Sequence, residues 1–270
     1  MSLEELVERV AGEIVRARWP VALTGAGVST ESGIPDFRGP QGLWRKYDPN
    51  EFTYSSFMED PARYWRRHME IFAGLSGVKP NPSHYALARL EELGRLKCLI
   101  TQNVDGLHQR AGSRNVVEFH GSLSQAKCLR CGSLYPMEEV EARVRAGEIP
   151  PKCGCGGILK PNVVFFEEPI PFEALSRAQA EALRCDLMLV AGTSASVYPA
   201  AELPYLAKFG RSPLYFPGLE PVVKDRPAVI VEVNLNPTQL TDTIADYSLL
   251  GKTGEILPKI VERVEGLLKG

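Results

Sequence analysis

Short apolar runs that end in small or polar residues recur at four places along the chain. They are VALTGAG (21–27), KCLITQNVDG (97–106), DLMLVAGTSAS (186–196) and AVIVEVNLNP (228–237). Continuous apolar runs of this length are typical of strands that are buried on both faces of a parallel sheet. Because open α/β sheets bind ligands beyond the carboxyl ends of their strands, we expect the loops after these four runs to converge on one site.

Helical patterns lie between and around these runs. The first nineteen residues, and the stretches 60–74, 82–94 and 255–270, carry apolar residues at intervals of three and four. Asp60 and Pro61 suit the N-cap and first position of a helix, with Gly74 as its end. The alternation predicts an α/β fold, a Rossmann-like doubly wound parallel sheet, while residues 128–161 break it and indicate an insertion.

Length and charge narrow the class of protein. The 270 residues, 44% of them hydrophobic, suffice for one large domain that carries a smaller one. A formal net charge of −2 argues against a nucleic-acid partner, and no basic run indicates a membrane surface. The N-terminal pattern is that of an amphipathic helix and not of a signal peptide, so we expect a cytoplasmic protein.

Four of the six cysteines form two tight pairs within the insertion. CLRCG holds Cys128 and Cys131, and KCGCGG holds Cys153 and Cys155. Four thiolates on glycine-rich turns suit one tetrahedral zinc ion, which would be structural because no position stays open for water. Two disulfides are the alternative, disfavoured in a reducing compartment. Cys98 and Cys185 fall in predicted strands and are expected in the core.

The stretch GAGVSTESGIPDFRG (25–39) opens like a dinucleotide-binding loop and then departs from it. Thr30 stands where the third glycine of the standard fingerprint belongs, and Gly33 comes later. An acidic residue about 20 positions further on, as a dehydrogenase would use for the ribose, is not evident.

Eight motifs occur in an order that resembles the sirtuins, NAD-dependent protein lysine deacylases, over residues 21–258. Besides the glycine loop and the cysteine pairs, they are TQNVDGLH (101–108), EFHG (118–121), VVFFEEP (163–169), GTSASVYPAAELP (192–204), VNLN (233–236) and GKTGEILP (251–258). The resemblance implies NAD as cofactor. It implies a discontinuous NAD-binding domain (1–38, 75–127 and 162–270), a helical part with the cofactor loop (39–74) and a zinc module (128–161).

The resemblance also implies which residues meet NAD. Backbone amides of the glycine turn would approach the pyrophosphate, and the loop beyond it would close over the reacting ribose, with Phe37 excluding solvent. The implied cofactor residues are Gly25, Ala26, Gly27, Pro35, Asp36, Phe37, Arg38, Trp44, Gln102, Asn103, Asp105, Gly192, Thr193, Ser194, Asn234, Leu235, Asn236, Lys252 and Thr253.

His120 matches the general base of the family, and Asn103 is the second implied catalytic residue. A neutral imidazole can take a proton from a ribose hydroxyl near pH 7. The implied reaction releases nicotinamide and O-acyl-ADP-ribose. His68, His84 and His108 lie in predicted helices and are expected to be ordinary packed or surface residues. Mono-ADP-ribosyl transfer and a non-catalytic module that binds NAD or acyl-lysine remain alternatives.

The implied substrate is an acyl-lysine protein, bound as an extended strand between two segments. Those segments hold Val164, Phe165, Phe166 and Glu167 on one side and Ser196 and Val197 on the other. Glu167 replaces the glycine of many relatives. Tyr64 and Arg67 share a helix face and resemble the pair with which class III sirtuins bind succinyl and malonyl groups, through a guanidinium that forks onto a carboxylate. The segment 211–227 has no role that we can assign.

Overall fold

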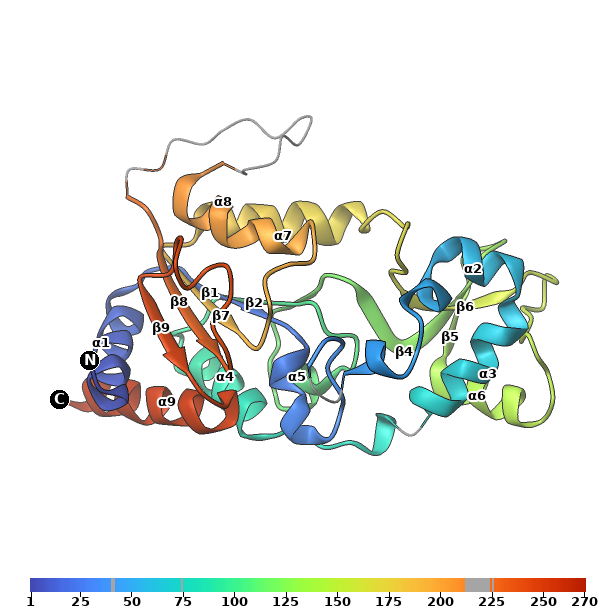
Figure 1. Ribbon diagram of the computed structural model, residues 1–270, viewed down its shortest axis with the longest axis horizontal. Helices are drawn as coiled ribbons and strands as arrows, with labels where there is room; N and C mark the ends of the chain where they lie inside the picture. Colours follow the sequence, from blue (N-terminus) through green and yellow to red (C-terminus); the bar gives the residue numbers. More distant parts are fainter. Residues whose placement is uncertain (40–41, 74, 212–223, 225) are drawn as a thin grey trace.

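A six-stranded parallel sheet forms the larger part of the molecule, in a computed structural model that describes residues 1–39, 42–73, 75–211, 224 and 226–270 (Figure 1). The strand order is β3-β2-β1-β7-β8-β9, and every neighbouring pair is parallel. The strands are β1 Pro20–Thr24, β2 Cys98–Thr101, β3 Val116–Glu118, β7 Leu187–Ala191, β8 Val229–Asn234 and β9 Tyr247–Leu250. The four apolar runs become β2, β1, β7 and β8, which are adjacent, so their carboxyl ends lie side by side.

Helices cover both faces of this sheet, as predicted. On one face pack α1 Leu3–Arg16, α4 Pro82–Glu92 and α9 Thr253–Lys269; on the other pack α7 Phe172–Arg184 and α8 Leu203–Phe209 (Figure 1). Strand β1 divides its side chains between the two cores, since Ala22 faces the first and Val21 and Leu23 face the second. Alternation with a period of two places every residue of this strand in the interior. The fold is therefore a doubly wound, Rossmann-like parallel sheet.

A second, antiparallel sheet has the order β5-β4-β6. Its strands are β4 Gly121–Cys128, β5 Leu134–Pro136 and β6 Leu159–Val163, and with it lie α2 Tyr54–Glu59, α3 Pro61–Ile71 and α6 Met137–Arg145. These elements share a third core, rich in aromatic side chains, in which Trp65 of α3 is fully buried and its indole nitrogen donates to the carbonyl of Leu159 at 2.9 Å. Helix α6 has no counterpart among the sequence predictions.

Local chemistry explains where the helices begin. In α1 the amide of Glu5 donates to Ser2 Oγ at 3.2 Å, and the amide of Ser2 donates to the Glu5 carboxylate at 2.8 Å, which is a capping box. The amide of Arg63 donates to Asp60 Oδ1 at 2.9 Å, so Asp60 caps α3 as predicted. Helix α3 ends at Ile71; Gly74, its predicted end, lies outside the described residues, as does most of 211–227.

The prediction that Cys185 lies in a strand is wrong. It follows the last residue of α7 with an extended backbone, and Asp186 separates it from β7. Its side chain is nevertheless buried in the core between α7 and the sheet. Among the described residues, no helix is long and apolar enough to cross a membrane.

Candidate active site

The loops that follow β1, β2 and β7 meet through side-chain contacts. Gln102, after β2, donates through Nε2 to Thr193 Oγ1 at 3.0 Å, and Thr193 follows β7. Asn103 donates through Nδ2 to the carbonyl of Gly25, after β1, at 3.1 Å. The convergence expected from the four apolar runs is thus present for three of them, and residues far apart in sequence form one cluster.

Close backbone packing accounts for the glycines of the first loop. A Cβ on Gly27 would lie 2.7 Å from the carbonyl oxygen of Gly192, and one on Gly25 would lie 2.7 Å from Thr193 Cβ. The amide of Gly27 donates to the Gly192 carbonyl at 2.8 Å, and that of Gly25 donates to the Ala191 carbonyl at 3.1 Å. These two amides join the loops after β1 and β7. The contact of this turn with a pyrophosphate stays a prediction.

His120 lies between β3 and β4, at the rim of this cluster. Its Nδ1 is 3.1 Å from the carbonyl oxygen of Gln102. A carbonyl can only accept, so Nδ1 carries the proton and the neutral ring keeps its lone pair on Nε2. Burial lowers the pKa of His120 below its usual value, partly opposed by the hydrogen bond to Gln102. The lowered pKa favours the neutral imidazole near pH 7, and the ring contacts Gln102, whose side chain reaches Thr193 of the loop after β7.

Ser29 and His84, for which the sequence predicts no role in the site, form a polar chain with the predicted residues Asn103 and Asp105. Ser29 Oγ donates to Asp105 Oδ2 at 2.7 Å and accepts from Asn103 Nδ2 at 3.1 Å, while His84 Nε2 lies 3.4 Å from the same hydroxyl. The amide of Asn81 donates to His84 Nδ1 at 3.2 Å, so the proton of a neutral His84 is on Nε2 and faces Ser29. The spacing between Ser29 and His84 carries no periodic signal, so only the tertiary structure reveals the contact.

His108 belongs to the same buried region. It lies in the short helix α5 Leu107–Arg110, and its Nε2 is 3.0 Å from Thr24 Oγ1. Its ring centroid is 4.8 Å from that of His84, and both side chains are at most 1% exposed. Both histidines are helical, as predicted, and each contacts a polar group at the carboxyl end of the sheet.

The predicted cofactor loop contacts the loop after β7 through Arg38. Arg38 donates through Nη1 to Ser196 Oγ at 2.8 Å and, at 3.3 Å, to Ser194 Oγ. Phe37 is 42% exposed, and its ring centroid is 5.1 Å from that of Trp44. Asp36, next to Pro35, accepts the amide of Gly39 at 2.8 Å, while positions 40–41 lie outside the described residues.

The remaining predicted cofactor residues lie at the end of β8 and the start of α9. Asn234 Nδ2 donates to the carbonyl of Asn236 at 2.8 Å, and Leu235 is exposed. Lys252 precedes α9 and pairs with Glu255. Thr253 is buried, and its hydroxyl lies 2.8 Å from Ser83 Oγ of α4. The Thr253 side chain thus faces α4.

Main-chain hydrogen bonds tie the predicted substrate segment to His120 and to the residues just before and at the start of α2. The amide of Val164 donates to the carbonyl of His120 at 2.9 Å. Phe166 donates its amide to the Phe52 carbonyl at 3.2 Å and accepts the Tyr54 amide on its own carbonyl at 2.9 Å. A peptide strand would therefore have to pair through residues on either side of Phe166.

Glu167 adopts a backbone conformation that favours glycine. Its φ is +76°, in the left-handed region. Its carboxylate accepts the amide of Ser55, at the start of α2, at 2.9 Å, and this bond lowers the pKa of Glu167. A glycine at this position would fit this conformation without strain.

Lys160 is a buried cation beneath the same segment. Its ammonium is 2.8 Å from Glu168 Oε2, donates to the carbonyl of Val163 at 2.6 Å and lies 4.0 Å from the centroid of the Phe165 ring. Burial lowers the pKa of Lys160, opposed by the contact with Glu168. The segment is therefore held to β6 by one side chain.

Tyr64 and Arg67 share a face of α3, as predicted, in different surroundings. Tyr64 is buried between Phe57 and Phe165, and burial raises the pKa of its hydroxyl. Arg67 is about one-third exposed, and its guanidinium already pairs with Glu51 and Glu70.

The four paired cysteines form a cluster that fits one zinc ion. Their sulfur atoms all lie within 4.8 Å of one another. Cys128 and Cys155 are 3.6 Å apart at sulfur, and Cys131 and Cys153 are 3.5 Å apart. Zn–S bonds of about 2.3 Å at tetrahedral angles place sulfurs about 3.8 Å apart, while a disulfide needs about 2.05 Å. All six cysteines are free thiols, so the structure excludes the disulfide alternative.

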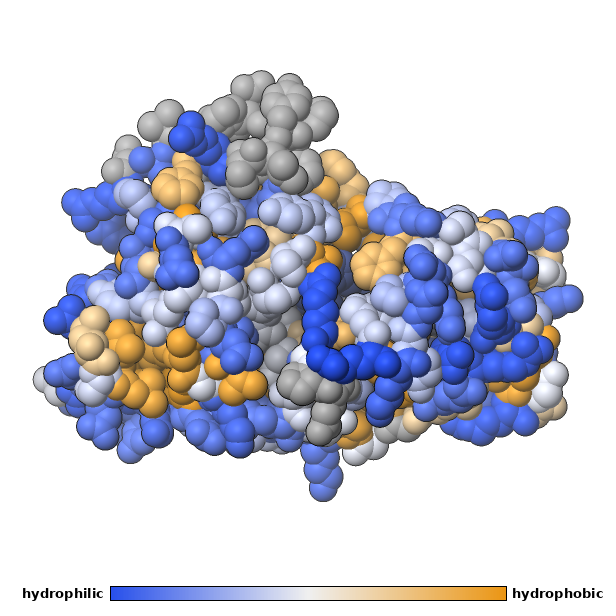
Figure 2. All heavy atoms as spheres, viewed as in Figure 1, coloured by the Kyte–Doolittle hydropathy of each residue, from blue (hydrophilic) through white to orange (hydrophobic). Residues whose placement is uncertain are grey.

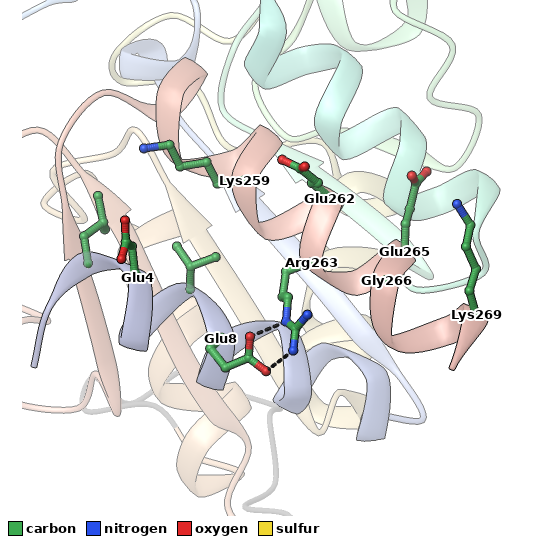
Figure 3. Close-up of a pocket in the computed structure, with 10 residues that line it drawn as sticks. Glu4, Glu8, Lys259, Glu262, Arg263, Glu265, Gly266 and Lys269 are labelled. Carbon is green, nitrogen blue, oxygen red and sulfur yellow. Dashed lines mark hydrogen bonds and ion pairs between the residues drawn. The ribbon is translucent and has the colours of Figure 1, made fainter.

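Two other parts of the surface that the structure describes differ from this site. Strongly hydrophilic side chains cross the middle of the face in Figure 2, between the two sheets. A shallow hollow between α1 and α9 is lined by charged side chains, and there Arg263 pairs with Glu8 (Figure 3). Acidic and basic side chains of α1 and α9 line this hollow together, so it has no single charge that would favour one kind of ligand.

Comparison with known proteins identifies the group to which these features belong. Residues 25–199 match the model of the Sir2 family. The chain is 46% identical to NAD-dependent protein deacetylase 1 of Pyrobaculum aerophilum, over 97% of this chain and 96% of that protein. A solved Sir2 homologue in complex with NAD has a TM-score of 0.82 and 45% identity, and the match covers 97% of this chain and 94% of that one. A Sir2 structure with a p53 peptide and NAD+ has a TM-score of 0.83 and 37% identity, covering 99% and 100%.

Proposed function

This chain belongs to the Sir2 family, and from that premise we propose that it is an NAD-dependent protein-lysine deacylase. The observation that carries the proposal is His120, a largely buried imidazole whose Nδ1 is held on the carbonyl of Gln102, in the loop after β2. When bound, NAD supplies an electrophilic ribose carbon and nicotinamide as the leaving group. His120 Nε2 accepts a proton from a ribose hydroxyl, which is general base catalysis.

Other residues hold the reactants and exclude water. The loop with Phe37 and Arg38 covers the cluster from the side of Ser194 and Ser196. Asn103 and Asp105, joined through Ser29, present amide and carboxylate groups to the nicotinamide end. Positioning in a closed, water-poor site accounts for much of the rate enhancement in such reactions.

The proposed protein substrate is an acyl-lysine segment bound as an extended strand between residues 164–167 and residues 196–197. The finer proposal is a preference for succinyl- or malonyl-lysine, with some deacetylase activity. It is supported by Arg67, a partly exposed guanidinium three residues from Tyr64 on the same helix. A guanidinium can bind a distal carboxylate through two parallel hydrogen bonds.

The test is turnover of one peptide carrying acetyl-, succinyl- or malonyl-lysine, with and without NAD. We expect nicotinamide, free lysine and soluble O-acyl-ADP-ribose in equal amounts. His120→Ala is expected to lose turnover by a factor of about 10² to 10⁴, with an unchanged circular dichroism spectrum. Near-normal turnover by this variant would refute the assignment of the base.

Two further readouts separate the alternatives. With labelled NAD, covalent label on protein in place of soluble product would favour ADP-ribosyl transfer and refute deacylation. Arg67→Met is expected to lose activity on succinyl- and malonyl-lysine more than on acetyl-lysine. Equal losses on all three peptides would remove the case for carboxylate recognition.

A further inference from the structure

We propose that Glu51 determines acyl preference, because it occupies the guanidinium that an acidic acyl group would need. Arg67 donates through Nε to Glu51 Oε2 at 2.8 Å and through Nη1 to Glu70 Oε2 at 2.6 Å. The inference rests on the proposed function, since it assumes that the acyl chain reaches Arg67.

Glu51 stands directly beside the proposed substrate segment. It lies in a 3₁₀ turn, Pro49–Phe52, and the next residue, Phe52, accepts the amide of Phe166. The ring centroid of Tyr47, which precedes Glu51 in the sequence, lies 4.7 Å from the Arg67 guanidinium. Glu51, Arg67 and the segment around Phe166 are therefore parts of one connected structure.

The geometry forces a competition. A carboxylate binds arginine best through two neighbouring nitrogens, and Nε and Nη1 are both engaged by protein carboxylates. A succinyl or malonyl carboxylate must displace one of these partners or bind beside them against like charge. An acetyl group carries no charge and meets no such conflict. Glu51 thus limits the proposed preference for acidic acyl groups, because it lowers their affinity below the level that an Arg67 without this partner would give, and it leaves acetyl-lysine little affected.

Glu51 is a better candidate than Glu70 for this role. The Glu51 side chain is 28% exposed and comes from a different segment, whereas Glu70 is 58% exposed and lies three residues from Arg67 on the same helix. Exposed pairs at this helical spacing contribute little. The contact with Nε also fixes the plane of the guanidinium, because Nε cannot rotate independently of it.

The experiment compares kcat/KM for one peptide bearing succinyl-lysine or acetyl-lysine in Glu51→Gln and in Glu59→Gln. Glu59, at the end of α2, lines with Glu51 a second surface hollow between residues 48–63 and Glu167. It is 80% exposed and lies 3.8 Å from Arg63, so its substitution makes the same charge change without touching Arg67. The succinyl-to-acetyl ratio is expected to rise about three- to tenfold in Glu51→Gln. In Glu59→Gln it is expected to stay within about twofold of wild type.

A third variant tests the cause. In the double variant Glu51→Gln/Arg67→Met the gain is expected to vanish, because no guanidinium is left to release. An unchanged or lower ratio in Glu51→Gln, or a gain that survives without Arg67, would overturn the inference. If the wild type turned over neither peptide with NAD, both the proposed function and this inference would be refuted. If the wild type is active but Glu51→Gln has the same succinyl-to-acetyl ratio, only this inference is refuted.

Discussion

Acidification should destabilise this protein through two buried imidazoles. Burial lowers the pKa of His84 to about 4, with Asp105 opposing the shift, and lowers that of His108 to about 3, aided by the neighbouring His84. The two rings lie side by side in the interior, where a charged imidazolium loses its hydration.

The sign and size follow from linkage. In the unfolded chain both histidines titrate near their ordinary pKa of about 6.5. As the pH falls below that value, the unfolded state binds protons that the folded state, with its lowered pKa values, does not bind. The contribution of the two neutral histidines to the free energy of unfolding is therefore complete above pH 6.5 and decreases as the pH falls below it. At pH 5 each histidine costs about 2 kcal/mol, or about 4 kcal/mol for the pair. His120, whose pKa is also lowered, acts in the same direction.

Urea unfolding followed by tryptophan fluorescence at several values between pH 7.5 and pH 5 would measure this loss. His108→Asn removes one titrating group, so its loss over this interval is expected to be about 2 kcal/mol smaller than that of wild type. The zinc cluster also loses ligands in acid, but it does so equally in both proteins. Parallel stability curves for wild type and His108→Asn would refute the reasoning.

Two further outcomes follow from single contacts. Lys160→Met should lower the free energy of unfolding by about 2 to 4 kcal/mol and raise KM for the peptide, because it leaves Glu168 without its cation. The control in urea unfolding is Lys152→Met, at an exposed lysine. Equal stability of the two variants would contradict the expectation. Gly27→Ala should cost about 1 to 3 kcal/mol, since its Cβ would lie 2.7 Å from the Gly192 carbonyl oxygen. Gly77→Ala, with open space around its Cβ, should unfold near the wild-type urea concentration; if Gly27→Ala did so too, the steric argument would fail.

The central strands could be predicted because both of their faces are buried. In β1 and β7 every residue is buried, so an unbroken apolar run identifies each strand without any partner. The edge strands β3 and β9 are short and only partly buried, so their sequences lack that signal. Helix α6 was not predicted, because it is a short helix between the two cysteine pairs and the insertion was interpreted from those pairs alone.

The residues of the candidate site also differ in whether the sequence could predict them. Residues that belong to contiguous motifs, such as Gln102 and His120, could be found from the sequence. Contacts between distant segments could not, and the pairing of Arg67 with Glu51 and the contact of Ser29 with His84 are both of this kind. Periodicity reports which face of an element is buried, but it does not report which side chain from another element meets it there.

The contacts of Phe166 and Glu167 constrain attempts to redesign this protein. The amide and carbonyl of Phe166 pair with the main chain at 52 and 54, and any residue but proline could keep the amide bond. The bond from the Ser55 amide to the Glu167 carboxylate depends instead on the side chain at 167. A graft of 163–168 without an acidic residue at 167 would therefore leave the start of α2 without this partner, so a chimera should exchange 51–55 together with 163–168.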